Sequence, residues 1–184
     1  SGTPRALNPG TSEWIRDVEG AERVGVFLDA PLEEVLRVRD RLALDWVQLH
    51  GDEPDSYLAA LGERVIRRVA VSSRPDWDRV RWIAERCLPL FDPGAGDGIA
   101  WAWDVLMEGP AEVRFGLAGG LTPDNVANAI EVVEPWGVDA ASGTEAAPGK
   151  KDPTLVRRFI ANARAAAPTP YLGPDELPYD WADE

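Results

Sequence analysis

Several polar side chains stand where apolar runs of the sequence end. Asp92 ends the run Leu88–Asp92 (LPLFD). A carboxyl group at the end of a buried strand is partly removed from water, which suits it to act as a general acid. An aspartate that only caps the next turn would look the same. Gln48 and His50 alternate in Trp46–Gly51 (WVQLHG), so both side chains point to the same side, as site residues or as a buried structural pair.

Two glycine-containing turns follow two successive apolar runs, and each turn precedes another amphipathic stretch. The first turn contains Gly119 and Gly120, and the second contains Ser142 and Gly143. Backbone N–H groups at a glycine turn that leads into a helix form a site for an anion. Either turn alone is compatible with an ordinary connection. Together, in consecutive units, they predict a phosphate site.

Composition argues against several other kinds of chemistry. The 184 residues include one histidine, His50, and one cysteine, Cys87, so we expect neither a metal centre nor a disulfide framework. The net charge of −13 argues against binding to a nucleic-acid backbone, which needs a basic surface. No apolar run approaches the ~20 residues of a membrane span, and no signal peptide is visible. We therefore expect a cytoplasmic protein.

The elements that must position these residues are alternating strands and helices. Six short apolar runs predict buried parallel strands, at Val24–Asp29, Trp46–Gly51, Val65–Val71, Leu88–Asp92, Val113–Leu117 and Gly137–Ala141. The stretches between them predict helices that begin at Pro31, at Thr122 as the cap with Pro123 following, and over Pro54–Leu61, Pro75–Cys87, Trp103–Met107 and Pro153–Ala167. Strands that alternate with helices imply a parallel sheet with right-handed crossovers.

Two α/β architectures fit this order, a doubly wound open sheet and a (β/α)8 TIM barrel. Polar residues at or just past nearly every strand end favour the barrel, because that rim is its active-site face. They are Asp29, Gln48, His50, Asp92, Asp139 and Ser142. We expect residues 1–167 to form the barrel domain and residues 168–184 to form an acidic, proline-rich tail.

Two further segments have weaker signals. The stretch Gly94–Gly98 (GAGDG), with Trp101 and Trp103 behind it, suggests a flap with an aromatic wall, although tryptophans more often belong to a core. The basic pair in Gly149–Asp152 (GKKD) precedes the last helix and is expected to be a solvated surface.

At this point the residues resemble a known family. The stretch VGVFLDAPLEEVLRVRDRLALDWVQLHGDEP (Val24–Pro54) is similar to the phosphoribosylanthranilate isomerases of tryptophan biosynthesis. The motifs LFDPGAG, GLAGGLTPDNVANAI, VDAASGTE and PGKKD follow in the order that the family uses, and the match covers roughly Pro4 to Ala165. The resemblance implies a TIM barrel.

That family converts N-(5′-phosphoribosyl)anthranilate to 1-(2-carboxyphenylamino)-1-deoxyribulose 5-phosphate by a general acid–base Amadori rearrangement. The resemblance therefore implies a phosphorylated small-molecule substrate, no metal, no cofactor, and a monomer or homodimer. Carried over position by position, it implies Asp92 as the acid, Arg5 at the anthranilate carboxylate, Asp139 near the sugar, Gln48 and His50 as active-site residues, and Gly119, Gly120, Ser142 and Gly143 at the phosphate.

The sequence also departs from the family. The family's first strand reads KICGI and its cysteine is the general base, but no such segment is present, so we expect six of eight barrel strands, an upstream β-α-β segment, and an inactive 184-residue chain. Cys87 sits at a helix end near the opposite rim and cannot replace the base. Lys and Thr are missing from the loop after Asp92.

Alternatives stay open. One is another phosphate-binding barrel enzyme, such as an indole-glycerol-phosphate synthase, which needs lysines at the strand ends, or a ribulose-phosphate epimerase, which needs several histidines. The other is a non-catalytic sugar-phosphate-binding relic, which the missing base favours.

Overall fold

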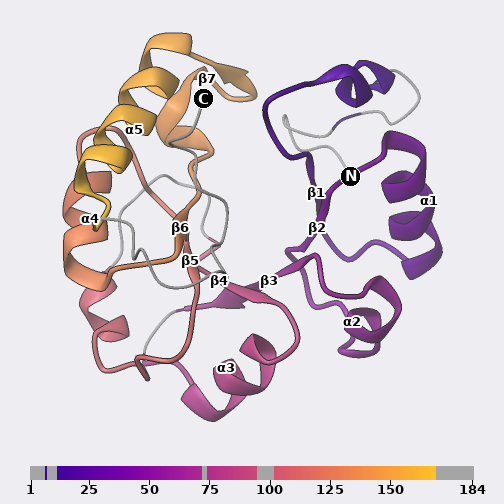
Figure 1. Ribbon diagram of the computed structural model, residues 1–184, viewed down its shortest axis with the longest axis horizontal. Coiled ribbons are helices and arrows are strands. Elements are labelled where there is room, and N and C mark those ends of the chain that lie inside the picture. Colours follow the sequence, from indigo (N-terminus) through magenta and orange to yellow (C-terminus); the bar gives the residue numbers. More distant parts are fainter. Residues whose placement is uncertain (1–6, 8–11, 72–73, 95–101, 169–184) are drawn as a thin grey trace, which may run out of the picture.

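The computed structural model describes residues 7, 12–71, 74–94 and 102–168. Six parallel strands form one sheet in sequential order, and helices follow the strands around its outside (Figure 1). The strands are β1 (Val24–Phe27), β2 (Trp46–Leu49), β3 (Val65–Ala70), β4 (Leu88–Asp92), β5 (Gly116–Leu117) and β6 (Gly137–Val138). The helices are α1 (Leu32–Leu42), α2 (Ser56–Leu61), α3 (Trp77–Ala84), α4 (Val126–Val133) and α5 (Pro153–Ala166), with 3₁₀ turns η2 (Glu13–Asp17), η3 (Trp103–Leu106) and η4 (Ser142–Thr144).

The sheet has the sequential, all-parallel strand order of a TIM barrel, as the sequence predicts. All five neighbouring strand pairs are parallel, and within the described residues β1 and β6 do not pair with each other. The described strands are therefore a six-stranded part of a barrel, with β1 and β6 as its edges.

The core lies between the sheet and the helices, in two clusters. One cluster packs α1, α2 and α3 against β2 and β3, around Val35, Val47 and Leu49. The other packs α4 and α5 against β4 and β5, around Phe91 and Leu117. Every second strand residue faces this layer, which leaves the alternate residues to face the barrel interior.

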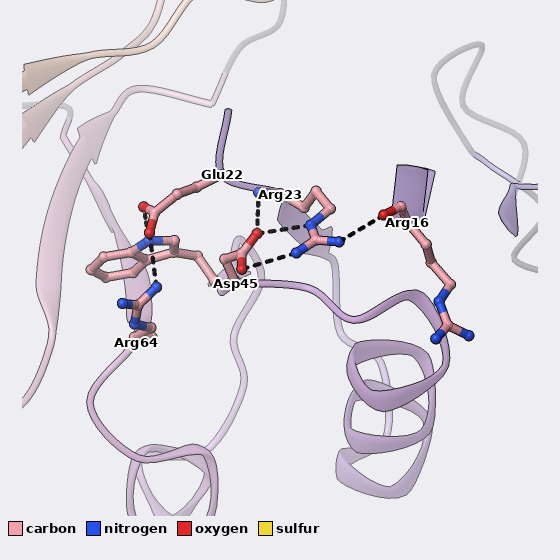
Figure 2. Close-up of polar contacts among 6 residues, drawn as sticks. Arg16, Glu22, Arg23, Asp45 and Arg64 are labelled. Carbon is pink, nitrogen blue, oxygen red and sulfur yellow. Dashed lines mark hydrogen bonds and ion pairs between the residues drawn. The ribbon is translucent and has the colours of Figure 1, made fainter. Parts of the chain in front are cut away.

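Charged side chains fasten the beginnings of β1, β2 and β3 together. Asp45 accepts hydrogen bonds from the backbone N–H of Arg23 at 2.7 Å and from its Nε at 2.9 Å (Figure 2). Glu22 accepts from Nε1 of Trp46 at 2.6 Å and from Nη1 of Arg64 at 2.8 Å. The Arg23 hydrogen bonds lower the pKa of Asp45. This network lies at the end of the strands opposite the predicted site, so it serves the fold.

Local details differ from the sequence expectations. The α-helix expected after Thr122 begins only at Val126. Thr122 nevertheless caps the intervening turn as expected, since its Oγ1 accepts the Asp124 N–H at 3.2 Å. The turn is closed by Asn125. Its Oδ1 accepts from the Thr122 N–H at 2.7 Å, and its Nδ2 donates to the Gly120 carbonyl at 2.9 Å. The strands expected over Val113–Leu117 and Gly137–Ala141 are shorter than predicted. Each has only two residues, Gly116–Leu117 in β5 and Gly137–Val138 in β6.

An antiparallel hairpin of β7 (Glu145–Ala147) and β8 (Lys150–Lys151) was not expected. Its turn includes Gly149 at φ +77°, a conformation that glycine adopts without strain. Trp103 packs in the core at 8% exposure, so it is not part of an aromatic flap. Arg5, Trp101, most of Gly94–Gly98 and all but the first residue of the 168–184 tail lie outside the described residues.

Candidate active site

Three titratable side chains from different strands converge at the carboxyl-terminal rim of the sheet. His50 follows β2, Asp92 ends β4 and Asp139 follows β6. His50 Nε2 lies 3.5 Å from Asp92 Oδ2. Nε2 of the buried Gln48 lies 3.1 Å from His50 Nδ1, so the prediction that Gln48 and His50 point to the same side is confirmed.

Asp92 is held in place by its own loop. Its side chain is 15% exposed, and its Oδ1 accepts the backbone N–H of Gly94 at 2.7 Å. Ala70 lies opposite Asp92 on β3, and the small Ala118 follows β5 on the other side. These methyl groups leave room for the carboxyl group to turn toward the interior. Asp92 therefore has one oxygen fixed by the backbone and the other directed at His50.

The pKa of Asp139 responds to the charges of Asp92 and His50, so the three side chains form one group. Loss of solvation raises its pKa above the ordinary value, and the negative charge of Asp92 raises it further. His50 and Lys151 act in the opposite direction. Asp139 keeps more than a third of its surface exposed, so solvent moderates the effect.

The two glycine turns lie against each other. Gly119 and Gly120 have φ values of +85° and +69°, and a Cβ at Gly119 would overlap the ring of Pro93. A Cβ at Gly143 would overlap the carbonyl oxygen of Leu121. The turn after β6 can therefore approach the turn after β5 only because residue 143 has no side chain.

The backbone of the first turn has donors to offer. The N–H groups of Gly119 and Gly120 have no hydrogen-bond acceptor among the described residues. Uncommitted backbone N–H groups in successive left-handed residues are a recurrent means of binding anions.

Lys151 braces the second turn, which sequence reasoning missed. The residue was expected only as part of a solvated pair, and it is exposed. Its Nζ nevertheless donates to the Ala141 carbonyl at 2.7 Å, the Ala140 carbonyl at 3.1 Å and the Thr144 hydroxyl at 2.8 Å. These contacts fix the backbone that leads into Ser142. The only signal in the sequence is that a lysine follows shortly after the turn.

Cys87 lies away from this rim. It is buried just before β4, at the opposite end of the strand from Asp92. Burial raises the pKa of its thiol to about 11, so it is protonated at neutral pH. Among the described residues, no group of three His, Cys, Asp or Glu side chains is arranged to hold a metal ion. No described helix is long and apolar enough to cross a membrane.

A parallel β/α sheet with carboxyl groups and two glycine-containing turns at its carboxyl-terminal rim is typical of the TIM-barrel class of enzymes that act on phosphorylated substrates. Residues 1–162 match the family model of N-(5′-phosphoribosyl)anthranilate isomerase. The chain is 42% identical to that isomerase from Geotalea daltonii over 171 residues, which are 88% of this chain and 81% of the relative. The chain belongs to this family, whose isomerases act in tryptophan biosynthesis.

Solved structures agree with the assignment. The isomerase from Thermotoga maritima superposes with a TM-score of 0.76 at 33% identity, covering 89% of this chain and 83% of that one. The isomerase from Thermus thermophilus gives a TM-score of 0.76 at 30% identity, covering 89% and 84%. Another isomerase structure, with a TM-score of 0.75 at 33% identity over 89% and 82% of the two chains, holds reduced 1-(o-carboxyphenylamino)-1-deoxyribulose 5-phosphate. The Thermotoga protein is described as dimeric.

Proposed function

We propose that the rim residues of this chain isomerise N-(5′-phosphoribosyl)anthranilate with Asp92 as the general acid. The observation that carries the proposal is the meeting of His50, Asp92 and Asp139 beside the two glycine turns. In this proposal the two turns after β5 and β6 supply backbone N–H donors for the phosphate. Asp92, at the end of the neighbouring β4, supplies the proton. In this proposal the 5′-phosphate of the ligand occupies the turns, and the acid lies next to the ribose.

In the proposed reaction, Asp92 transfers its proton to the ring oxygen of the ribose. The bond between C1′ and that oxygen breaks, and the nitrogen lone pair forms a Schiff base. A base then removes the C2′ proton, and the resulting enol becomes the ketone of the product. The substrate and product are isomers, so the reaction consumes no external oxidant or reductant.

The other side chains have binding roles in this proposal. Gly119, Gly120, Ser142 and Gly143 bind the phosphate, and Asp139 lies at the sugar. Gln48 orients His50 through their 3.1 Å contact, and His50 faces the acid. Arg5, outside the described residues, is proposed at the anthranilate carboxylate because of the family resemblance.

The base is a separate matter. In the family it is a cysteine of a KICGI strand, and the single cysteine of these 184 residues, Cys87, is buried at the other end of β4. We therefore propose that the 184-residue chain by itself binds ligand but is inactive. Fusion of a β-α-β segment with a KICGI strand ahead of Ser1 should restore turnover.

Asp92→Asn in that fusion tests the acid. General acid catalysis contributes ~10²–10⁴-fold, so kcat should fall by that factor. Affinity for the reduced product analogue should change by less than about threefold, because the amide has nearly the same shape. Steady-state kinetics and calorimetry measure the two quantities. A kcat within a few-fold of the parent would remove Asp92 from the proposal, and ligand binding without turnover in the parent fusion would favour a binding relic.

A further inference from the structure

Arg68 places a cation inside the barrel, on β3. It lies opposite Leu90 of β4, and Ala70 lies opposite Asp92. Because alternate residues of a strand share a face, Arg68 is on the same interior face as Asp92, one row below it. The side chain of the neighbouring Arg67 points to the other face of the sheet, toward the helices, and is 9% exposed.

The side chain of Arg68 extends toward the loop that holds Asp92. A Cβ at Gly94 would overlap Nη2 of Arg68, and it would lie 2.8 Å from Cζ and 3.3 Å from Nε. The guanidinium thus occupies space that only glycine leaves open. The N–H of Gly94 is the donor to Asp92 Oδ1, at 2.7 Å. Arg68 therefore ends beside the proposed acid, at the mouth of the barrel.

The guanidinium of Arg68 has no ion-pair partner in the described part of the chain. The Nε of Arg68 is buried and has no hydrogen-bond acceptor, and no described carboxylate forms an ion pair with the side chain. Arg23, in contrast, shares two hydrogen bonds with the carboxylate of Asp45. A cation that is partly withdrawn from water without a partner is costly, and an anionic ligand group would offset that cost.

The order of groups around the rim indicates which anion. The glycine turns follow β5 and β6, Asp92 ends β4, and Arg68 lies on β3, so the acid stands between the phosphate turns and Arg68. The substrate in the proposed function has its ribose ring between a phosphate and a carboxylated aromatic ring. We propose that Arg68, in addition to the Arg5 proposed above, binds the carboxylate of that aromatic end and so selects carboxylated ligands, an inference that rests on the proposed function.

Calorimetry on the 184-residue chain tests this with two ligands. One is reduced 1-(o-carboxyphenylamino)-1-deoxyribulose 5-phosphate, and the other is the same molecule without its carboxyl group. Arg68→Met, which keeps most of the length and removes the charge, should weaken the first ligand by about 10- to 100-fold. It should weaken the second by less than about threefold. Arg68→Lys should recover part of the loss, because it restores charge but not the two-pronged geometry.

Arg64→Met is the matched control, since it removes one positive charge just before the same strand, at the opposite rim. It should leave both affinities unchanged. If Arg68→Met weakens the binding of both ligands equally, Arg68 only supports the Gly94 loop. If it weakens the binding of neither, Arg68 has no role in binding. Both results overturn the inference. A wild-type chain that binds neither ligand overturns the proposed function as well, whereas one that binds both equally overturns the inference alone.

Discussion

At the scale of single residues, Asp139 links the site to stability. Its pKa is raised above the ordinary 3.8, so the native protein holds this proton more tightly than the unfolded chain does. The ionised group therefore lowers stability above pH 3.8, and this cost grows until the pH has passed the raised native pKa. Asp139→Asn should raise the free energy of unfolding at pH 7, by less than about 1 kcal/mol because solvent still reaches the side chain.

Urea denaturation at pH 4 and pH 7 measures this difference. The gain should be smaller at pH 4, where the unfolded aspartate is itself close to half-protonated. Asp17→Asn, on the exposed turn η2, is the control for the loss of one carboxylate. A gain of equal size at both pH values for Asp139→Asn would show that something other than its titration is responsible.

At the scale of elements, the hairpin of β7 and β8 acts as a brace for the turn after β6. Lys151→Met removes three donated hydrogen bonds and leaves two backbone carbonyls and the Thr144 hydroxyl without their donor. The turn that contains Ser142 and Gly143 should loosen, and Kd for ribulose 5-phosphate should rise about tenfold, which corresponds to about 1.4 kcal/mol. Calorimetry measures it. Lys150→Met, in the same strand, should have little effect, and similar losses in both variants would point to overall charge instead of the brace.

At the scale of the whole molecule, the described sheet leaves apolar side chains of β1 and its extension exposed. Val24, Val26 and Leu28 are 44%, 61% and 59% exposed, on the edge strand of the described sheet. Exposed apolar edge strands promote association. We expect the 184-residue chain to self-associate as its concentration rises, and Val26→Lys to reduce that association in sedimentation velocity. Ala59→Lys, which adds the same charge on exposed α2, should not, and equal behaviour of the two variants would exclude the strand edge as the contact.

The sequence by itself determined what depends on local periodicity. Apolar runs and the amphipathic stretches between them predict the six strands and most helices, and the two-residue period of a strand places Gln48 and His50 on one side. Turn chemistry accounts for Gly119 and Gly120, because both adopt left-handed conformations, which favour glycine. The same logic identified Thr122 as a cap, and its Oγ1 accepts the Asp124 N–H, but it did not predict that a turn closed by Asn125 delays the α-helix to Val126.

Only the tertiary structure decided which distant groups meet. The approach of Arg68 to Gly94, the bracing of the turn after β6 by Lys151, and the effect of Asp92 on Asp139 each join different strands or loops. Such contacts depend on sheet register, on curvature and on the small side chains that lie between them. None of these leaves a periodic trace along the chain, because a contact between strands is fixed by how the strands pair and not by the order of residues within either one.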